Sequence, residues 1–379
     1  MKSRRVAATR AQHSKSDSIN RETKTRYEQL PTSVVSSENL RGKGSRLRLP
    51  RIGIALSLSA AFICLFIFVS SQKRSLVYNA LDHFQSLNIA PTVDNGTATR
   101  RRAVATTLYS SNYAIAAAVL AHSLRRANVS SRLLLIYIEG RISEEALCIS
   151  RAAGWEPLPV PFIPPPHHGN GILEWYQDQY TKLNIWGLDQ HGVDRLVYLD
   201  ADTLVFRNID ELFDIPFNFA AVPDVFAPDD PRGFSLSFNA GVLALRPSSK
   251  ILADMIKKTE TATFPLEQAE QSFLNAYFAS KRALLPYIYN AGIVIKRQSS
   301  DLWEELKREM KIMHFTNVKP FLEENQAADK ILSELELEDA IRRACERKGL
   351  YSEEIEAWRD AYRRMMRNKG DSISRCRAI

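Results

Sequence analysis

Short apolar runs alternate with segments of helical periodicity between residues 101 and 200. Strands are predicted at residues 103–108, 133–138 and 156–162, and in the apolar run that ends at Asp200. Helices are predicted at residues 113–124, 144–153 and 176–183. Strands that alternate with helices are typical of an α/β fold with a mostly parallel sheet that is covered on both faces. Such sheets bind ligands beyond the carboxyl ends of their strands.

The remaining segments suggest a membrane-anchored chain. Residues 1–51 have no apolar period and are predicted to form a disordered, basic, cytosolic tail. Residues 52–71 carry no charge and are long enough to cross a hydrocarbon core of about 30 Å. Residues 72–100 are interpreted as a stem, residues 101–322 as the catalytic domain and residues 323–379 as a helical extension. A cleaved signal peptide or a buried helix are the alternatives for residues 52–71.

Charge is concentrated at the N-terminal end. The chain has a formal net charge of +8, and residues 1–51 hold 13 Lys and Arg against 4 Asp and Glu. The other residues are therefore close to neutral, which argues against DNA or RNA as a partner. More positive residues precede the apolar segment than follow it, so the C-terminal bulk is predicted to be lumenal.

The glycosylation motifs are compatible with a lumenal location. Asn95 and Asn128 each begin an Asn-x-Ser/Thr motif. With Cys64 in the predicted membrane segment, Cys148, Cys345 and Cys376 remain, and they allow at most one intrachain disulfide. The sequence does not indicate which pair forms it.

Two carboxylates, Asp200 and Asp202, follow directly on a predicted buried strand. Burying unpaired charges is costly, so a hard divalent cation between them would explain their position. Such a cation commonly binds a diphosphate as well. A solvated polar turn is the alternative.

Several segments, in this order, resemble the glycogenin-type glycosyltransferases of family eight. They are residues 107–109 with 121–124, residues 180–183, 198–204 and 208–213, Phe-Asn-Ala-Gly-Val at 238–242, Glu-Gln-Ser-Phe-Leu-Asn at 270–275 and Met-His-Phe-Thr at 313–316. The resemblance covers about residues 101–321. It implies a nucleotide-diphospho-sugar transferase (Rossmann-like) fold and retaining, hexosyl-type transfer from a UDP-sugar.

The resemblance assigns residues to the metal and the nucleotide. Asp200, Asp202 and His314 match the ligands of Mn²⁺, and Lys319 matches a lysine that contacts the diphosphate. The other matching residues lie around the nucleotide sugar, and they are Thr107, Leu108, Tyr109, Tyr113, Lys182 and Ala201. Tyr113 could equally belong to the core, and Lys182 and Lys319 could be ordinary surface lysines.

The resemblance also suggests residues on the sugar side. Asn239 matches an asparagine beside the sugar, and Gln271 would place an amide dipole near the reacting carbon. Glu270 stands where an aspartate is usual, which leaves its role as a nucleophile open, and Asn317 replaces a usual glycine. A second Asn-Ala-Gly, at 290–292, is interpreted as coincidence.

The acceptor is expected to be a glycan, glycoprotein or lipid in the Golgi. Self-glucosylation of the glycogenin kind is not supported, because residues 291–298 contain no tyrosine. A non-catalytic nucleotide or sugar binder and a metal-dependent phosphoesterase are the alternative functions.

Overall fold

The computed structural model describes residues 101–347 and 349–378. The predicted cytosolic tail, membrane segment and stem lie outside these residues. Within the described part, we find no helix with the length and apolar character needed to span a membrane.

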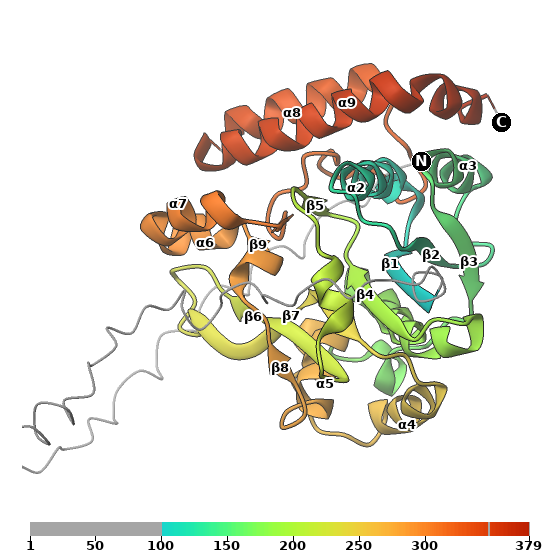
Figure 1. The fold of residues 1–379 in the computed structure, drawn as a ribbon, viewed down its shortest axis with the longest axis vertical. Coiled ribbons are helices and arrows are strands. Elements are labelled where there is room, and N and C mark those ends of the chain that lie inside the picture. The colour runs from blue at the N-terminus through green and yellow to red at the C-terminus, as the bar shows by residue number, and fades with distance from the viewer. Residues whose placement is uncertain (1–100, 348, 379) are drawn as a thin grey trace, which may run out of the picture. The chain divides into compact units, whose positions relative to one another are not determined.

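A seven-stranded sheet forms the centre of the described region (Figure 1). Its strands, in spatial order, are β3 (Glu156–Val160), β2 (Arg132–Ile138), β1 (Arg102–Leu108), β4 (Arg195–Leu199), β7 (Phe234–Leu245), β6 (Phe219–Val225) and β8 (Ala283–Leu284). All neighbours pair in parallel except β7, which is antiparallel to both β4 and β6. The predicted α/β fold with a mostly parallel central sheet is therefore confirmed.

Helical segments cover both faces of the sheet, and each face has its own hydrophobic core. The first core includes residues of α2 (Ala114–Arg126), α3 (Glu144–Ala153), α8 (Glu334–Arg347) and α9 (Ser352–Cys376). The second includes residues of η5 (Glu174–His191), α4 (Ser249–Thr259) and α5 (Ala269–Tyr277). Local sequence sets the ends of α3, because the Ser143 hydroxyl accepts a hydrogen bond from the Ala146 amide and Gly154 adopts a φ of 108°.

The segment that precedes β4 differs from its prediction. Residues 174–191 form successive 3₁₀ turns in η5 rather than an amphipathic α-helix. Every position from Tyr180 to Trp186 is buried, so the segment has no exposed face with the period of an α-helix. The shorter helical segments are η3 (Ser111–Tyr113), η4 (Pro166–Gly169), η6 (Asp210–Asp214), η7 (Leu266–Gln268), η8 (Tyr287–Tyr289), α6 (Val294–Gln298), α7 (Ser300–Glu309) and η9 (Gly349–Tyr351).

A second, three-stranded sheet joins segments that are far apart in the sequence. It consists of β5 (Thr203–Val205), β10 (Ile312–His314) and β9 (Ala291–Gly292), with β10 in the middle. His314 pairs with Thr203 on one side and with Gly292 on the other. The small sheet therefore places His314 between the segment that follows Asp202 and the segment that follows Asn290.

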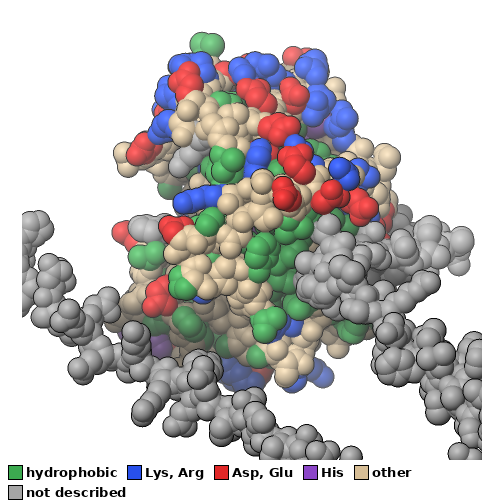
Figure 2. Space-filling model, turned by 90° about the vertical axis from the view of Figure 1, so that its left-hand side faces the viewer, with side chains coloured by type: hydrophobic (Ala, Val, Ile, Leu, Met, Phe, Trp, Pro, Cys, Tyr) green, Lys and Arg blue, Asp and Glu red, His purple; other side chains and the backbone are tan. Residues whose placement is uncertain are grey.

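Of the two long C-terminal helices, α9 packs on α2 and α3, and α8 packs on α9. On the face shown in Figure 2, positive and negative side chains are intermixed over the upper part of the molecule, where these helices lie. Arg359 and Arg363 of α9 pair with Glu338 of α8 at 2.7 and 3.0 Å. A disulfide between Cys148 and Cys376 joins α3 to the end of α9.

Candidate active site

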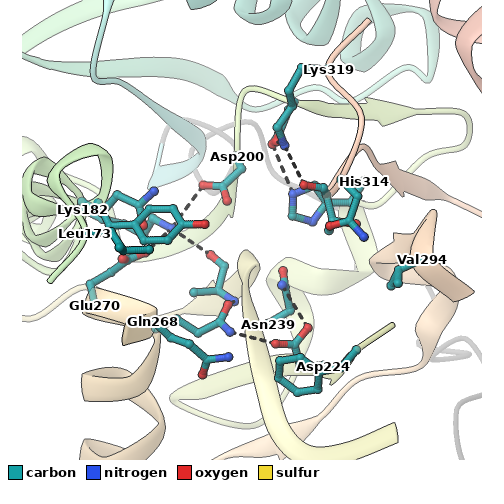
Figure 3. A pocket seen from close by; sticks show the side chains of 18 of the residues that line it. Leu173, Lys182, Asp200, Asp224, Asn239, Gln268, Glu270, Val294, His314 and Lys319 are labelled. Atoms are coloured by element: carbon teal, nitrogen blue, oxygen red, sulfur yellow. Dashed lines mark hydrogen bonds and ion pairs between the residues drawn. The ribbon is translucent and has the colours of Figure 1, made fainter. Parts of the chain in front are cut away.

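A cleft of about 630 Å³ opens beside the end of β4 (Figure 3). Its wall includes most of the residues that the sequence singles out. These are Thr107, Tyr109, Tyr113, Lys182, Asp200, Ala201, Asp202, Asn239, Glu270, Gln271, His314 and Lys319. Leu108 is the exception, because its side chain is fully buried in the core. Successive side chains of a strand point to opposite faces, so Thr107 faces the cleft and Leu108 faces away from it.

The two acids lie close to His314, although more than one hundred residues separate them from this histidine in the sequence. Asp200, Asp202 and His314 each offer a ligand atom, and these atoms all lie within 4.8 Å of one another. His314 Nε2 is 3.2 Å from Asp202 Oδ1. The pairing of β5 with β10 brings them together, since β5 begins directly after Asp202 and β10 ends at His314.

The hydrogen bonds around His314 assign a proton to its Nδ1. Asn239 Oδ1 accepts from the Gly241 amide, and Asn239 Nδ2 donates to Asp224. Asn290 must therefore direct its Nδ2 at Asn239 Oδ1 and its Oδ1 at His314 Nδ1, and both distances are 3.0 Å. His314 Nδ1 is consequently the donor to Asn290 Oδ1, so Nε2 is the ring nitrogen that faces the acids and is placed to bind a metal ion.

Gly241 allows this arrangement to be compact. A Cβ at this position would lie 2.2 Å from His314 Cε1 and 2.9 Å from Asn239 Oδ1. Any larger residue would displace the imidazole ring or the asparagine. Gly241 is thus required by a close approach of side chains to the backbone.

The residues present fit a divalent metal ion. Two carboxylates and a neutral imidazole are a typical ligand set for such ions, and the Asn290 bond to Nδ1 is the outer contact that metal-binding histidines usually have. Asp202 is buried, which alone would raise the pKa of its carboxyl, but Lys319 and His314 hold this pKa well below its usual value. Asp202 is therefore available as an anionic ligand.

Lys182 lies between two of the predicted acidic residues (Figure 3). Its ammonium nitrogen is 3.2 Å from Asp200 Oδ1 and 2.7 Å from Glu270 Oε1, and it also donates to the Ala240 carbonyl at 3.3 Å. Burial would lower the pKa of Lys182, but Asp200 and Glu270 raise it above its ordinary value. Lys182 therefore remains charged and fixes both carboxylates.

A second hydrogen-bond network in the cleft is centred on Asp224. Gln271 Nε2 donates to Asp224 Oδ2 at 2.8 Å, and Gln271 Oε1 accepts from the Ala240 amide at 2.9 Å. Asp224 also accepts from Asn239 at 3.2 Å. Burial raises the pKa of Asp224 despite these hydrogen bonds. Because Asp224 contacts Asn239 and Asn239 contacts Asn290, this network continues to His314.

The first strand and the turn after it line another part of the cleft, with Thr107, Tyr109 and Tyr113. Tyr113 contacts Phe321 edge to face at a centroid distance of 5.1 Å, and Phe321 in turn packs on Trp358 of α9 at 5.6 Å. Burial raises the pKa of Tyr113 to about 12. The ring of Tyr113 is thus supported from behind by the C-terminal helices.

Two residues of these networks are absent from the sequence prediction. Asp224 follows an apolar run, in the same manner as Asp200, and this was the signal that could have identified it. Asn290 belongs to the second Asn-Ala-Gly, and its side chain bonds directly to Asn239 of the first. The interpretation of this recurrence as coincidence therefore overlooked a contact between the two asparagines.

Comparison with known proteins agrees with this geometry. The family model of glycosyl transferase family 8 matches residues 105–325. Glycogenin of Neurospora crassa is 29% identical over 223 residues, which are 58% of this chain and 31% of that protein. Galactinol synthase 2 of Solanum lycopersicum is 31% identical over 185 residues, covering 41% of this chain and 52% of that protein. The match thus spans 31% and 52% of the lengths of these two relatives.

A solved structure with a similar chain trace is that of the glycosyltransferase GlyE of Streptococcus pneumoniae. It shares 20% sequence identity, has a TM-score of 0.45, and the match covers 64% of this chain and 60% of that chain. The family model extends over more than half of the sequence and includes all three candidate metal ligands. The chain therefore belongs to glycosyl transferase family 8.

Proposed function

We propose that this protein transfers a sugar, with retention of configuration, from a UDP-sugar to a glycan, glycoprotein or lipid acceptor, and that Mn²⁺ is its cofactor. The observation that carries the proposal is the convergence of Asp200, Asp202 and His314 at one end of the cleft, beside Lys319. Carboxylates with an imidazole suit Mn²⁺. A divalent ion held by these residues would neutralise the charge that develops on the departing diphosphate.

The protein's own residues have separate roles in this proposal. Lys319 supplies a positive charge for the diphosphate, next to Asp202. The ring of Tyr113 provides a surface for the uracil base, and Asn239 and Asp224 provide hydrogen bonds for the sugar hydroxyls. Gln271 is fixed at both ends of its amide group, so its dipole has one orientation toward the sugar.

We further propose that the protein is a type II membrane protein of the Golgi with a lumenal catalytic domain. The proposal rests on the uncharged segment 52–71 and the positive residues before it. The Cys148–Cys376 disulfide suits an oxidising compartment, and Asn128 of the second glycosylation motif is exposed.

The test is an assay of the full-length protein in detergent with a panel of UDP-sugars, in the presence of Mn²⁺ or EDTA. At least one donor should be hydrolysed or transferred with Mn²⁺, and EDTA should abolish the activity. Asp202→Ala should lose this turnover, whereas Asp254→Ala, which removes a partly exposed carboxylate on α4, should keep it. Silence with every donor would refute a transferase function.

The same assay distinguishes the non-catalytic alternative. A protein that only binds nucleotide would retain UDP together with Mn²⁺ in an equilibrium titration, yet it would release no UDP from any donor. Glu270 and Asn317, which depart from the family pattern, motivate this comparison.

A further inference from the structure

The cleft extends beyond the residues that the proposed reaction uses. The outer part of its lining comes from two sets of residues. The first set is Leu173, Tyr176, Gln179, Glu267 and Gln268, and the second is Val225, Phe226, Ala227 and Arg232. Figure 3 shows Leu173 and Gln268 on one side of the view and Val294 on the other. Apart from the Val225 amide, which donates to Asp224 Oδ1 at 3.0 Å, none of these residues contributes to the metal site or to the network around Gln271. The space between them is therefore available for a second substrate.

The loop between β6 and β7 presents an aromatic ring in a fixed position. The Phe226 amide donates to the Gly233 carbonyl at 2.8 Å, which closes the loop. Arg232 lies over the Phe226 ring, with Cζ 3.7 Å from the ring centroid. Asp230 holds the same guanidinium, since Arg232 Nε is 2.9 Å from Asp230 Oδ1 and 3.1 Å from Oδ2. Phe226 and Arg232 are thus ordered before any ligand binds.

The other set of outer lining residues combines apolar and hydrogen-bonding groups. Leu173 is 45% exposed although it is a large apolar residue, and Tyr176 lies on the same segment. Glu267 and Gln268 add a carboxylate and an amide from η7. The hydrogen bond that Arg232 donates to Asp230 raises the pKa of Arg232, and the negative charges of Asp230, Asp224 and Glu267 raise it further. Glu267 is therefore close enough to act electrostatically on Arg232.

The charges on these walls select against an acidic ligand. Arg232 is the one cation among the outer lining residues that the structure describes, and Asp230 already neutralises it. Glu267 adds a negative charge, whereas the two lysines that could bind an anion lie deeper, at Asp200 and Asp202. Apolar surfaces flanked by planar hydrogen-bonding groups suit a sugar ring, whose faces are apolar and whose edges carry hydroxyls.

We propose that this outer half of the cleft is the acceptor subsite and that it binds an uncharged sugar between Phe226 and Glu267. This inference rests on the proposed transferase function. In the step that it serves, the acceptor hydroxyl oxygen bonds to the anomeric carbon of the donor. The bond from that carbon to the diphosphate oxygen breaks, its electron pair stays on UDP, and the departing diphosphate takes up the hydroxyl proton.

The experiment compares transfer with hydrolysis in the full-length protein. UDP release from the active donor is measured in water alone and with added methyl glycosides. The panel contains the β-glucoside, β-galactoside, β-xyloside and α-mannoside as uncharged probes, and the β-glucuronide as the acidic counterpart of the glucoside. At least one uncharged glycoside should accelerate UDP release and yield a disaccharide, and the glucuronide should be a poorer acceptor than the glucoside.

Variants then locate the subsite. Phe226→Ala should lower the ratio of transfer to hydrolysis by about tenfold, mainly through a higher KM for the glycoside. Phe162→Ala is the matched control, because Phe162 is an exposed phenylalanine under Arg141, with Cζ 4.4 Å from its ring, and it does not line the cleft. This control should leave the ratio unchanged. Glu267→Lys should shift preference from the glucoside toward the glucuronide.

The outcomes separate the two proposals. Hydrolysis without transfer to any uncharged glycoside, or equal ratios in Phe226→Ala and Phe162→Ala, would overturn the acceptor subsite while the transferase function stands. Better transfer to the glucuronide than to the glucoside in the unmodified protein would overturn the charge argument. The absence of hydrolysis with every donor would instead remove the transferase function.

Discussion

Replacing Asn290 by alanine tests whether this residue orients the candidate metal ligand His314. The Asn290 side chain is buried, and its amide bridges His314 Nδ1 and Asn239 Oδ1 at 3.0 Å each. Alanine leaves the Nδ1 proton of His314 without a partner, while Asn239 keeps its bonds to Gly241 and Asp224. The ring of His314 then loses the contact that fixes its tautomer.

Two separate magnitudes follow from this loss. An unsatisfied buried donor costs about 1–3 kcal/mol, which should appear in the free energy of unfolding without metal. Removing an outer partner of a metal-binding histidine weakens metal affinity by about 10- to 100-fold. By the usual conversion this is about 1.4–2.7 kcal/mol of binding free energy. We expect both effects in Asn290→Ala, and the second should be observed in molecules that are still folded.

Metal affinity is measured by titrating Mn²⁺ into the full-length protein with UDP present and following the electron paramagnetic resonance signal of free Mn²⁺. Asn290→Asp is the informative control, because a carboxylate oxygen can still accept from His314 Nδ1 but cannot donate to Asn239. It should keep its affinity for Mn²⁺ within about threefold, in contrast to the 10- to 100-fold loss in Asn290→Ala. Folded Asn290→Ala with unchanged affinity for Mn²⁺ would refute the orienting role.

Three further predictions concern other parts of the described fold. Gly241→Ala should cost about 1–3 kcal/mol of stability through overpacking and should weaken Mn²⁺ binding. Gly292→Ala should change neither stability nor Mn²⁺ binding, because a Cβ at this position would lie 3.6 Å from its nearest neighbour, Thr316 Cγ2. Cys148→Ser should lower the free energy of unfolding in urea by about 2–4 kcal/mol, because it removes the disulfide to α9. The oxidised parent protein should be more stable than both the reduced parent protein and the variant, and equal stability of all three would contradict this. The pKa of Tyr113 is about 12 in the folded protein and 10.0 ordinarily, so the free energy of unfolding should fall as pH rises from 10 to 12. In urea titrations at pH 9 and 11, Tyr113→Phe should lose less stability between the two pH values than the parent protein. An equal loss in both proteins would exclude this contribution.

Much of the central fold could be predicted from local pattern. The apolar runs that became β1, β2 and β4 are long enough to identify strands, and the capping residues Ser143 and Gly154 delimit α3. The 3₁₀ turns of η5 could not be predicted, because burial on all sides removes the period on which a helix assignment depends. The short strands β5, β9 and β10 carry two or three residues each and are defined by their partners alone.

The candidate site was predictable where charge stands out against apolar surroundings. Asp200 and Asp202 follow an apolar strand, so the sequence alone indicates an unusual pair. Asn290 and Asp224 act through contacts with residues distant in the sequence, and only the folded chain brings them to Asn239. Neutral amides carry no charge signal, so spacing could not have revealed that Asn290 orients His314.

The geometry around Glu270 bears on the role that the sequence left open. Glu270 Oε1 lies 2.7 Å from Lys182 Nζ, and both side chains are almost fully buried. Breaking a buried ion pair leaves an uncompensated charge, which is far more costly than the pair itself. Lys182 also holds Asp200 at 3.2 Å, so Glu270 balances the lysine that positions a candidate metal ligand. We infer that Glu270 is a positioning residue, and that Gln271, whose amide bridges Asp224 and the Ala240 backbone, is the group presented to the sugar.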